Sequence, residues 1–258
     1  MSKIITPHPT LCAYCRRPYG NYTKDHVIPE SWYPTCTPLN TEKWQVPCCR
    51  ACNNGYSSDE ETIRNQLAMT IDPNDPRAQG IWPRVFRSYS AFSGKNAKDA
   101  QIRERRRQKL LDELMPFSHE HSRALVHFSR RGAENETVVT FSAKKFERVV
   151  TKLVLGAHCY LEKTPLPEAA NIEVHVLQTR DAAVEAFEPL LRSMEQYELG
   201  PGILIRRGCA ADVDRFASMF MFVLWGQVDL YASVEVNLHV ADDSCVTALR
   251  NRFGPSAH

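Results

Sequence analysis

The sequence lacks any long apolar run. Its first residues, MSKIITPHPTLCAYC, contain no apolar stretch of about 7–15 residues such as a signal peptide carries, and no segment approaches the roughly 20 apolar residues of a membrane helix. It also shows no internal repeat. These absences predict a cytoplasmic protein without a membrane partner, and they argue against a secreted, membrane-spanning or repeat protein.

Cysteine, by contrast, is concentrated at one end of the chain. The 258 residues are 43% hydrophobic, enough for one large domain or two modest ones to bury a core. Six of the nine cysteines fall within the first 52 residues. Because thiols stay reduced in the cytoplasm, this clustering predicts metal binding rather than disulfides.

The cysteine spacing predicts a structural zinc site. Cys12 and Cys15 form one C-x2-C knuckle, and Cys49 and Cys52 form a second. Four thiolates complete the tetrahedral coordination of zinc, so such a site is structural. Cys48 is an alternative to Cys49, but it would widen the second knuckle. The other four cysteines are expected to be ordinary thiols: Cys36, Cys159, Cys209 and Cys245.

Composition and charge divide the chain into three regions. Residues 1–71 are rich in Pro, Thr, Cys and Asn and are expected to need the metal to fold. Residues 72–131 form a basic, mainly helical linker region, and residues 132–258 form a more acidic α+β region. A basic middle suits contact with a polyanion, although charged blocks are also common on solvated surfaces.

Local patterns predict α+β architecture. In the first region, 27–28 and 44–47 are expected to pair as a hairpin, and Ser57 to cap a helix over 61–69 that ends before Asp72-Pro73. A loop holding Trp82, Phe86, Tyr89 and Phe92 then leads to a helix over 98–114. The third region predicts strands over 137–141 and 171–177 and helices over 143–161 and 180–198. After the apolar run over 202–207, strands of an antiparallel sheet are predicted over 216–225, 228–234 and 235–240, with a tight turn at Gly226-Gln227.

The stretch KDHVIPE places Asp25 beside His26, just before a short apolar run. Carboxylate and amide oxygens suit Mg²⁺ or Mn²⁺, and an imidazole can take a proton from water. If the hairpin and the following helix face each other, Asp25 and His26 would meet Asn53. Neighbouring strand residues point to opposite faces, so this meeting requires a bend or the end of the strand.

Three motifs together resemble the HNH endonuclease family, in its four-cysteine zinc form with a ββα-metal core. They are the Cys12/Cys15 knuckle, Asp25-His26-Val27-Ile28-Pro29, and the run VPCCRACNNG over 46–55. The resemblance covers about residues 10–60. It implies a small zinc-braced ββα-metal domain, followed here by the helical region and the C-terminal α+β region with its antiparallel sheet.

The resemblance also implies roles for individual residues. His26 would be the general base, and Asp25 and Asn53 would hold a catalytic Mg²⁺ or Mn²⁺, with Asn54 as an alternative to Asn53. DNA would be the substrate, with RNA as an alternative. Trp44 stands where the family usually has an asparagine, and Asn40 is the candidate replacement. Glu60 could approach the metal, but helix capping explains it more simply.

The predicted helix over 98–114 is a candidate nucleic-acid contact. Its basic residues are Arg103, Arg105, Arg106, Arg107 and Lys109. The alternative is a solvated face with an Asp99–Arg103 pair. The leading hypothesis is thus a metal-dependent DNA endonuclease. A zinc-stabilised nucleic-acid-binding or regulatory module with a degenerate nuclease site is the second, and a protein-interaction scaffold the third, with residues 132–258 available to a protein partner.

Overall fold

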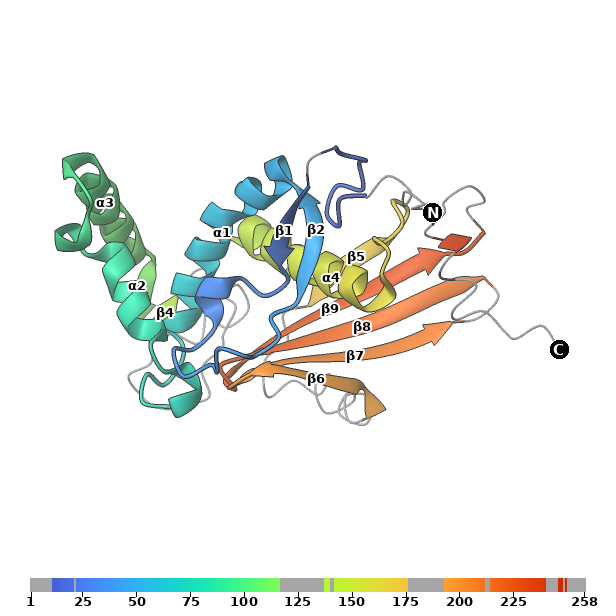
Figure 1. Cartoon of the computed structure of the whole chain (residues 1–258). Helices are drawn as coiled ribbons and strands as arrows, with labels where there is room; N and C mark the ends of the chain where they lie inside the picture. Colours follow the sequence, from blue (N-terminus) through green and yellow to red (C-terminus); the bar gives the residue numbers. More distant parts are fainter. Residues whose placement is uncertain are drawn as a thin grey trace.

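The computed structural model describes residues 11–20, 22–116, 137–139, 142–175, 193–211, 214–239, 246–247 and 249. Within these ranges the chain is mixed α+β, as the sequence predicts. Figure 1 shows an N-terminal hairpin with helix α1 (Arg50–Ala68), a long helix α4 (Ala143–Glu162) and a large antiparallel sheet. Helix α3 (Ala97–Glu113) projects at the opposite end from the sheet. Helix α4 contacts α1, the hairpin and the sheet, so it lies between the N-terminal unit and the strands.

The N-terminal unit has the order strand, strand, helix. Strands β1 (Tyr22–His26) and β2 (Gln45–Cys49) pair antiparallel, with Asp25 opposite Val46, and α1 (Arg50–Ala68) follows at once. The predicted helix start at Ser57 is wrong. The helix begins at Arg50 because Cys49 occupies the N-cap, where its sulfur accepts a bond from the backbone N–H of Cys52.

A second correction concerns the segment predicted as an aromatic loop. It forms helix α2 (Ile81–Tyr89), with Ile81 and Val85 buried and Phe86 exposed. Short 3-10 turns, η1 (Glu30–Trp32), η2 (Pro76–Ala78) and η3 (Ala91–Ser93), connect the neighbouring elements. The prediction of a basic helix is confirmed by α3 (Ala97–Glu113), which leads into a small sheet of β3 (Leu114–Pro116) and β4 (Thr137–Val139).

The C-terminal region places α4 (Ala143–Glu162) against a five-stranded sheet in the order β5-β9-β8-β7-β6, with every neighbouring pair antiparallel. The strands are β5 (Asn171–His175), β6 (Glu195–Gly200), β7 (Ile203–Ala211), β8 (Arg215–Leu224) and β9 (Val228–Asn237). Alternate residues are buried along β7 and β9, as expected where one face packs on a core.

Two predictions for this region need correction. The two strands expected over 228–234 and 235–240 are one continuous strand, β9, whose pairing with β8 runs unbroken to Asn237. The last residues of the helix expected over 180–198 belong instead to strand β6, because Glu195–Glu198 pair with β7. The part of that helix over 180–192 lies outside the described residues.

One hydrophobic core spans the N-terminal unit, α4 and the sheet. Trp32 and Trp225 pack with ring centroids 6.3 Å apart, and Trp225 Nε1 donates a 2.7 Å hydrogen bond to the carbonyl of Trp32. Trp44 stacks on Tyr160 of α4 at 4.3 Å. The hairpin is therefore built into the same core as the C-terminal sheet. Within the described ranges, no helix has the length and apolar character needed to cross a membrane.

Candidate functional site

The two cysteine knuckles meet in space. The ligand atoms of Cys12, Cys15, Cys49 and Cys52 all lie within 4.8 Å of one another. This geometry confirms that the four predicted thiols converge, and four thiols at this separation can hold a metal ion such as zinc. The cluster ties the segment before β1 to the junction of β2 and α1, so it holds together the open end of the hairpin, where β1 begins and β2 ends.

Backbone N–H groups point at the cysteine sulfurs. The N–H of Cys49 donates to Cys12 Sγ, and the N–H of Cys52 donates to Cys49 Sγ, each at 3.4 Å. The bond from Cys52 is the largest influence that lowers the pKa of Cys49, to about 7. Because the thiolate is the metal-binding form, this bond prepares Cys49 to be a ligand.

Cys48 lies outside the cluster, in agreement with the predicted preference for Cys49. Its side chain is buried, and burial raises its pKa to about 11, which keeps it a thiol. Thr23 Oγ1 lies 3.3 Å from its sulfur. Cys36 and Cys209 are exposed and Cys159 is buried, and none of the three is in a disulfide, whereas Cys245 lies outside the described residues.

Asp25 is engaged by two side chains. Tyr14 donates a 2.7 Å hydrogen bond from its hydroxyl to Asp25 Oδ2, and Lys152 Nζ of α4 forms an ion pair with the same oxygen at 3.0 Å. Burial and the neighbouring carboxylate raise the pKa of Tyr14 well above its usual range, so its hydroxyl keeps the proton that it donates. Sequence patterns gave no sign of Lys152, which is 127 positions away.

Glu60 reaches the same lysine. Its carboxylate lies 2.8 Å from Lys152 Nζ, and the side chain of Lys152 is fully buried. The capping explanation for Glu60 is wrong, because α1 begins ten positions earlier, at Arg50. Glu60 instead faces Asp25 across the ammonium group. The nearby Asp59 pairs with Arg148 and Lys145, so α1 and α4 are joined by several ion pairs.

Asn53 is on the first turn of α1, ahead of the helix start predicted at Ser57, and its amide binds a residue of β1. Asn53 Nδ2 donates to Thr23 Oγ1 at 3.1 Å. Thr23 and Asp25 alternate with Lys24 along β1, so they share one face of the strand. The carbonyl of Asn54 accepts a hydrogen bond from Ser57, a local contact within α1. The structure therefore brings Asn53 to the face that holds Asp25, with its amide bound to Thr23.

His26 ends β1, opposite Gln45 of β2. Its side chain is half-buried, and its Nε2 accepts a 2.8 Å hydrogen bond from the amide of Gln45. Its carbonyl accepts from Lys152 Nζ at 2.7 Å. The two halves of the Asp25-His26 pair thus have separate partners: the carboxylate binds buried groups from α4 and Tyr14, and the imidazole meets a side chain of the hairpin.

Trp44, which stands where the HNH pattern has an asparagine, packs into the core. It is nearly buried, stacked on Tyr160 and edge-on to Tyr197 of β6 with ring centroids 5.2 Å apart. Its carbonyl accepts from Val27 N, which continues the hairpin beyond His26. Asn40 is exposed in the connecting loop. The position of the expected asparagine is therefore used to attach the hairpin to the C-terminal region.

The basic face of α3 is largely paired with acids of the chain. Arg103 pairs with Asp99, as the alternative interpretation expected, and Arg107 pairs with Glu104. Arg106 reaches Glu61 of α1 at 3.0 Å. Lys109 lines a small hollow between α1 and α3. Within the described part of the chain, Arg105 makes no ion pair, so it is the α3 arginine most available to a phosphate.

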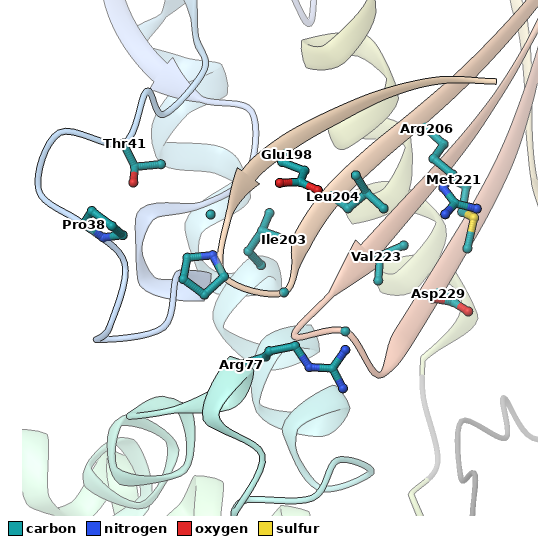
Figure 2. Close-up of a pocket in the computed structure, with 14 residues that line it drawn as sticks. Pro38, Thr41, Arg77, Glu198, Ile203, Leu204, Arg206, Met221, Val223 and Asp229 are labelled. Atoms are coloured by element: carbon teal, nitrogen blue, oxygen red, sulfur yellow. The ribbon is translucent and has the colours of Figure 1, made fainter.

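A cavity of about 800 Å³ lies at the end of the large sheet, and Figure 2 shows its lining. Leu204, Met221 and Val223 form apolar lining, while Arg206 and Asp229 contribute charges of opposite sign. None of the residues predicted as the site lines it. An apolar lining with charges of both signs does not indicate one class of ligand. The candidate functional site is therefore the one in the N-terminal unit.

Comparison with known proteins adds no relative. A scan against protein-family models, a search of curated proteins and a search of solved structures each gave no match. The resemblance to HNH endonucleases therefore depends on the motifs of residues 10–60 and on the geometry described above.

Proposed function

We propose that this chain is an endonuclease of the HNH type that hydrolyses phosphodiester bonds of DNA. The observation that carries the proposal is the β1-β2-α1 order with four converging thiols at its ends and His26 at the end of β1. Cys12, Cys15, Cys49 and Cys52 would hold a structural zinc ion, which supplies no chemistry because four thiolates fill its coordination.

His26 is the residue assigned to chemistry. Its imidazole would take a proton from the attacking water as the water oxygen bonds to phosphorus, and the 3′ oxygen that leaves would take a proton from solvent. In the described state Nε2 accepts from Gln45, so the attacking water has to take the place of that amide. Asp25 and Lys152 hold the end of β1, through the carboxylate and through the carbonyl of His26.

The expected Mg²⁺ or Mn²⁺ ligands do not fit such an ion. Asp25 already binds Lys152 and Tyr14, and the Asn53 amide donates to Thr23. No step of the proposed hydrolysis is therefore assigned to an ion at Asp25.

The test is plasmid cleavage by the purified zinc-loaded chain in Mg²⁺, in Mn²⁺ and in EDTA. His26→Ala is expected to abolish nicking and to keep zinc content and Tm, because its side chain is outside the core. His175→Ala is the matched control: this histidine of β5 bonds to Ser233, far from the hairpin in sequence, and its loss is expected to leave nicking unchanged. Equal nicking by wild type and His26→Ala would contradict the proposal.

A second candidate function is supported by the Lys152–Asp25 pair. Because the Asp25 carboxylate is already paired with Lys152, the unit also suits a zinc-held module that binds nucleic acid without cutting it. This candidate predicts binding of a labelled duplex that weakens steeply between 50 and 200 mM salt, and no cleavage in any of the three conditions. A matched RNA duplex separates DNA from RNA binding.

A further inference from the structure

The ammonium group of Lys152 on α4 is enclosed by three oxygen atoms from two other elements, β1 and α1. The His26 carbonyl of β1 lies 2.7 Å from Nζ, Glu60 of α1 lies 2.8 Å away, and Asp25 of β1 lies 3.0 Å away. The Tyr14 ring lies on another side, with its centroid 5.5 Å from Nζ. An ammonium has three N–H donors, and here three oxygens surround it.

These oxygens are of the kind that a hard divalent cation uses. Two carboxylates and one backbone carbonyl are typical ligands of Mg²⁺ or Mn²⁺. The Lys152 side chain is fully buried, and the side chains of Asp25 and Glu60 are only 15% and 14% exposed. A divalent ion could enter only by displacing the ammonium group.

Lys152 is not free to leave. Its neighbours Val149 and Leu153 on α4 are completely buried in the core that joins the hairpin to the sheet. Withdrawing the lysine would mean moving α4 out of that core or burying an ammonium without partners, and both are costly. The cation is thus fixed by the packing of the helix that carries it.

We propose that the ammonium of Lys152 is the resident cation of the Asp25–Glu60 pair and takes the place that a divalent ion would occupy. The wild-type chain then binds no Mg²⁺ or Mn²⁺ at this pair. Removing the ammonium leaves two adjacent carboxylates and the His26 carbonyl, which convert the position into a divalent-cation site. The proposal concerns which cation lies at the Asp25–Glu60 pair, and it does not depend on whether the chain cleaves DNA.

The test uses the zinc-loaded full chain and Mn²⁺ alone, with free Mn²⁺ followed by electron paramagnetic resonance. Wild type is expected to bind no Mn²⁺ that depends on Asp25. Lys152→Ala is expected to bind one Mn²⁺ and to gain several degrees in Tm at about ten times the Kd. Adding Glu60→Gln to Lys152→Ala is expected to remove both effects.

Lys145→Ala is the matched control. Lys145 also lies on α4 and also pairs with an acid of α1, Asp59, but its side chain is 37% exposed. Its removal is expected to create no Mn²⁺ site, because water replaces the lost partner.

Two results would overturn the proposal. One is a Mn²⁺ ion bound by wild type and lost in Asp25→Asn. The other is a folded Lys152→Ala that gains no Mn²⁺ binding. If Lys152→Ala does not fold, the comparison of wild type with Asp25→Asn decides alone. Cleavage is not the readout, so loss of the nuclease proposal would leave this one standing.

Discussion

The N-terminal unit carries two contrasting cation centres. The cysteine cluster has four converging thiols that could hold an ion from solution, whereas the Asp25–Glu60 pair already faces the ammonium of Lys152. The thiols come from two short segments, and the second centre joins residues 25, 60 and 152. The contrast is between a site that could bind an external cation through four thiols and a pair of carboxylates whose cation is a side chain of the same protein.

The largest expected effect tests the external cation. Cys49→Ala is expected to lose zinc and unfold the hairpin unit, because structural zinc binding contributes about 10 kcal/mol or more to folding. Zinc content by mass spectrometry and circular dichroism measure the two losses. Cys36→Ala, at an exposed thiol, is the control and should keep both. A Cys49→Ala chain with one zinc and an unchanged Tm would refute the assignment.

The next effect tests the attached cation. Lys152→Met is expected to lower the free energy of unfolding by about 4 kcal/mol, because it leaves two buried carboxylates without their partner. Urea denaturation measures this loss. Lys145→Met, which removes an exposed pair with Asp59, should cost about 1 kcal/mol or less. Equal losses in the two variants would remove the distinction between a buried and a surface cation.

A smaller effect is expected at the hairpin's attachment to the C-terminal region. Trp44→Asn, which introduces the residue usual at this place in HNH endonucleases, should lower the free energy of unfolding by about 3 kcal/mol through loss of packing against Tyr160 and Tyr197. Thermal denaturation gives the measurement, and Asn40→Ala at an exposed loop position serves as the reference. A more stable Trp44→Asn would show that the stacked pair is not an anchor.

The smallest effect is expected at the exposed cations of α3, in contrast to the buried Lys152. Arg105→Glu should lower the salt slope of DNA binding by about one or two, since each phosphate contact contributes roughly one to that slope. Arg107→Glu should change it less, because Arg107 already pairs with Glu104. Fluorescence anisotropy across a salt series measures both. Slopes equal to wild type in both variants would mean that α3 does not contact the nucleic acid.

Local sequence signals predicted those elements whose cause is local. Helices α3 and α4 follow from propensity and apolar spacing, and the β8–β9 turn follows from Gly226, whose φ of 63° favours glycine. The start of α1 was missed because a cysteine, not Ser57, caps it. Strand β6 was missed because its pairing with β7 outweighs the helical pattern over 180–198.

The sequence spacing predicted each cysteine knuckle, because a two-residue gap brings both sulfurs of a knuckle to one point, and the pairing of β1 with β2 brings the two knuckles together. The sequence also determined the neighbouring positions of Asp25 and His26. Only the tertiary structure decided what Asp25 binds. Its ammonium partner comes from a helix 127 positions away, and packing of α4 in the shared core, not any spacing along the chain, brings Lys152 between Asp25 and Glu60.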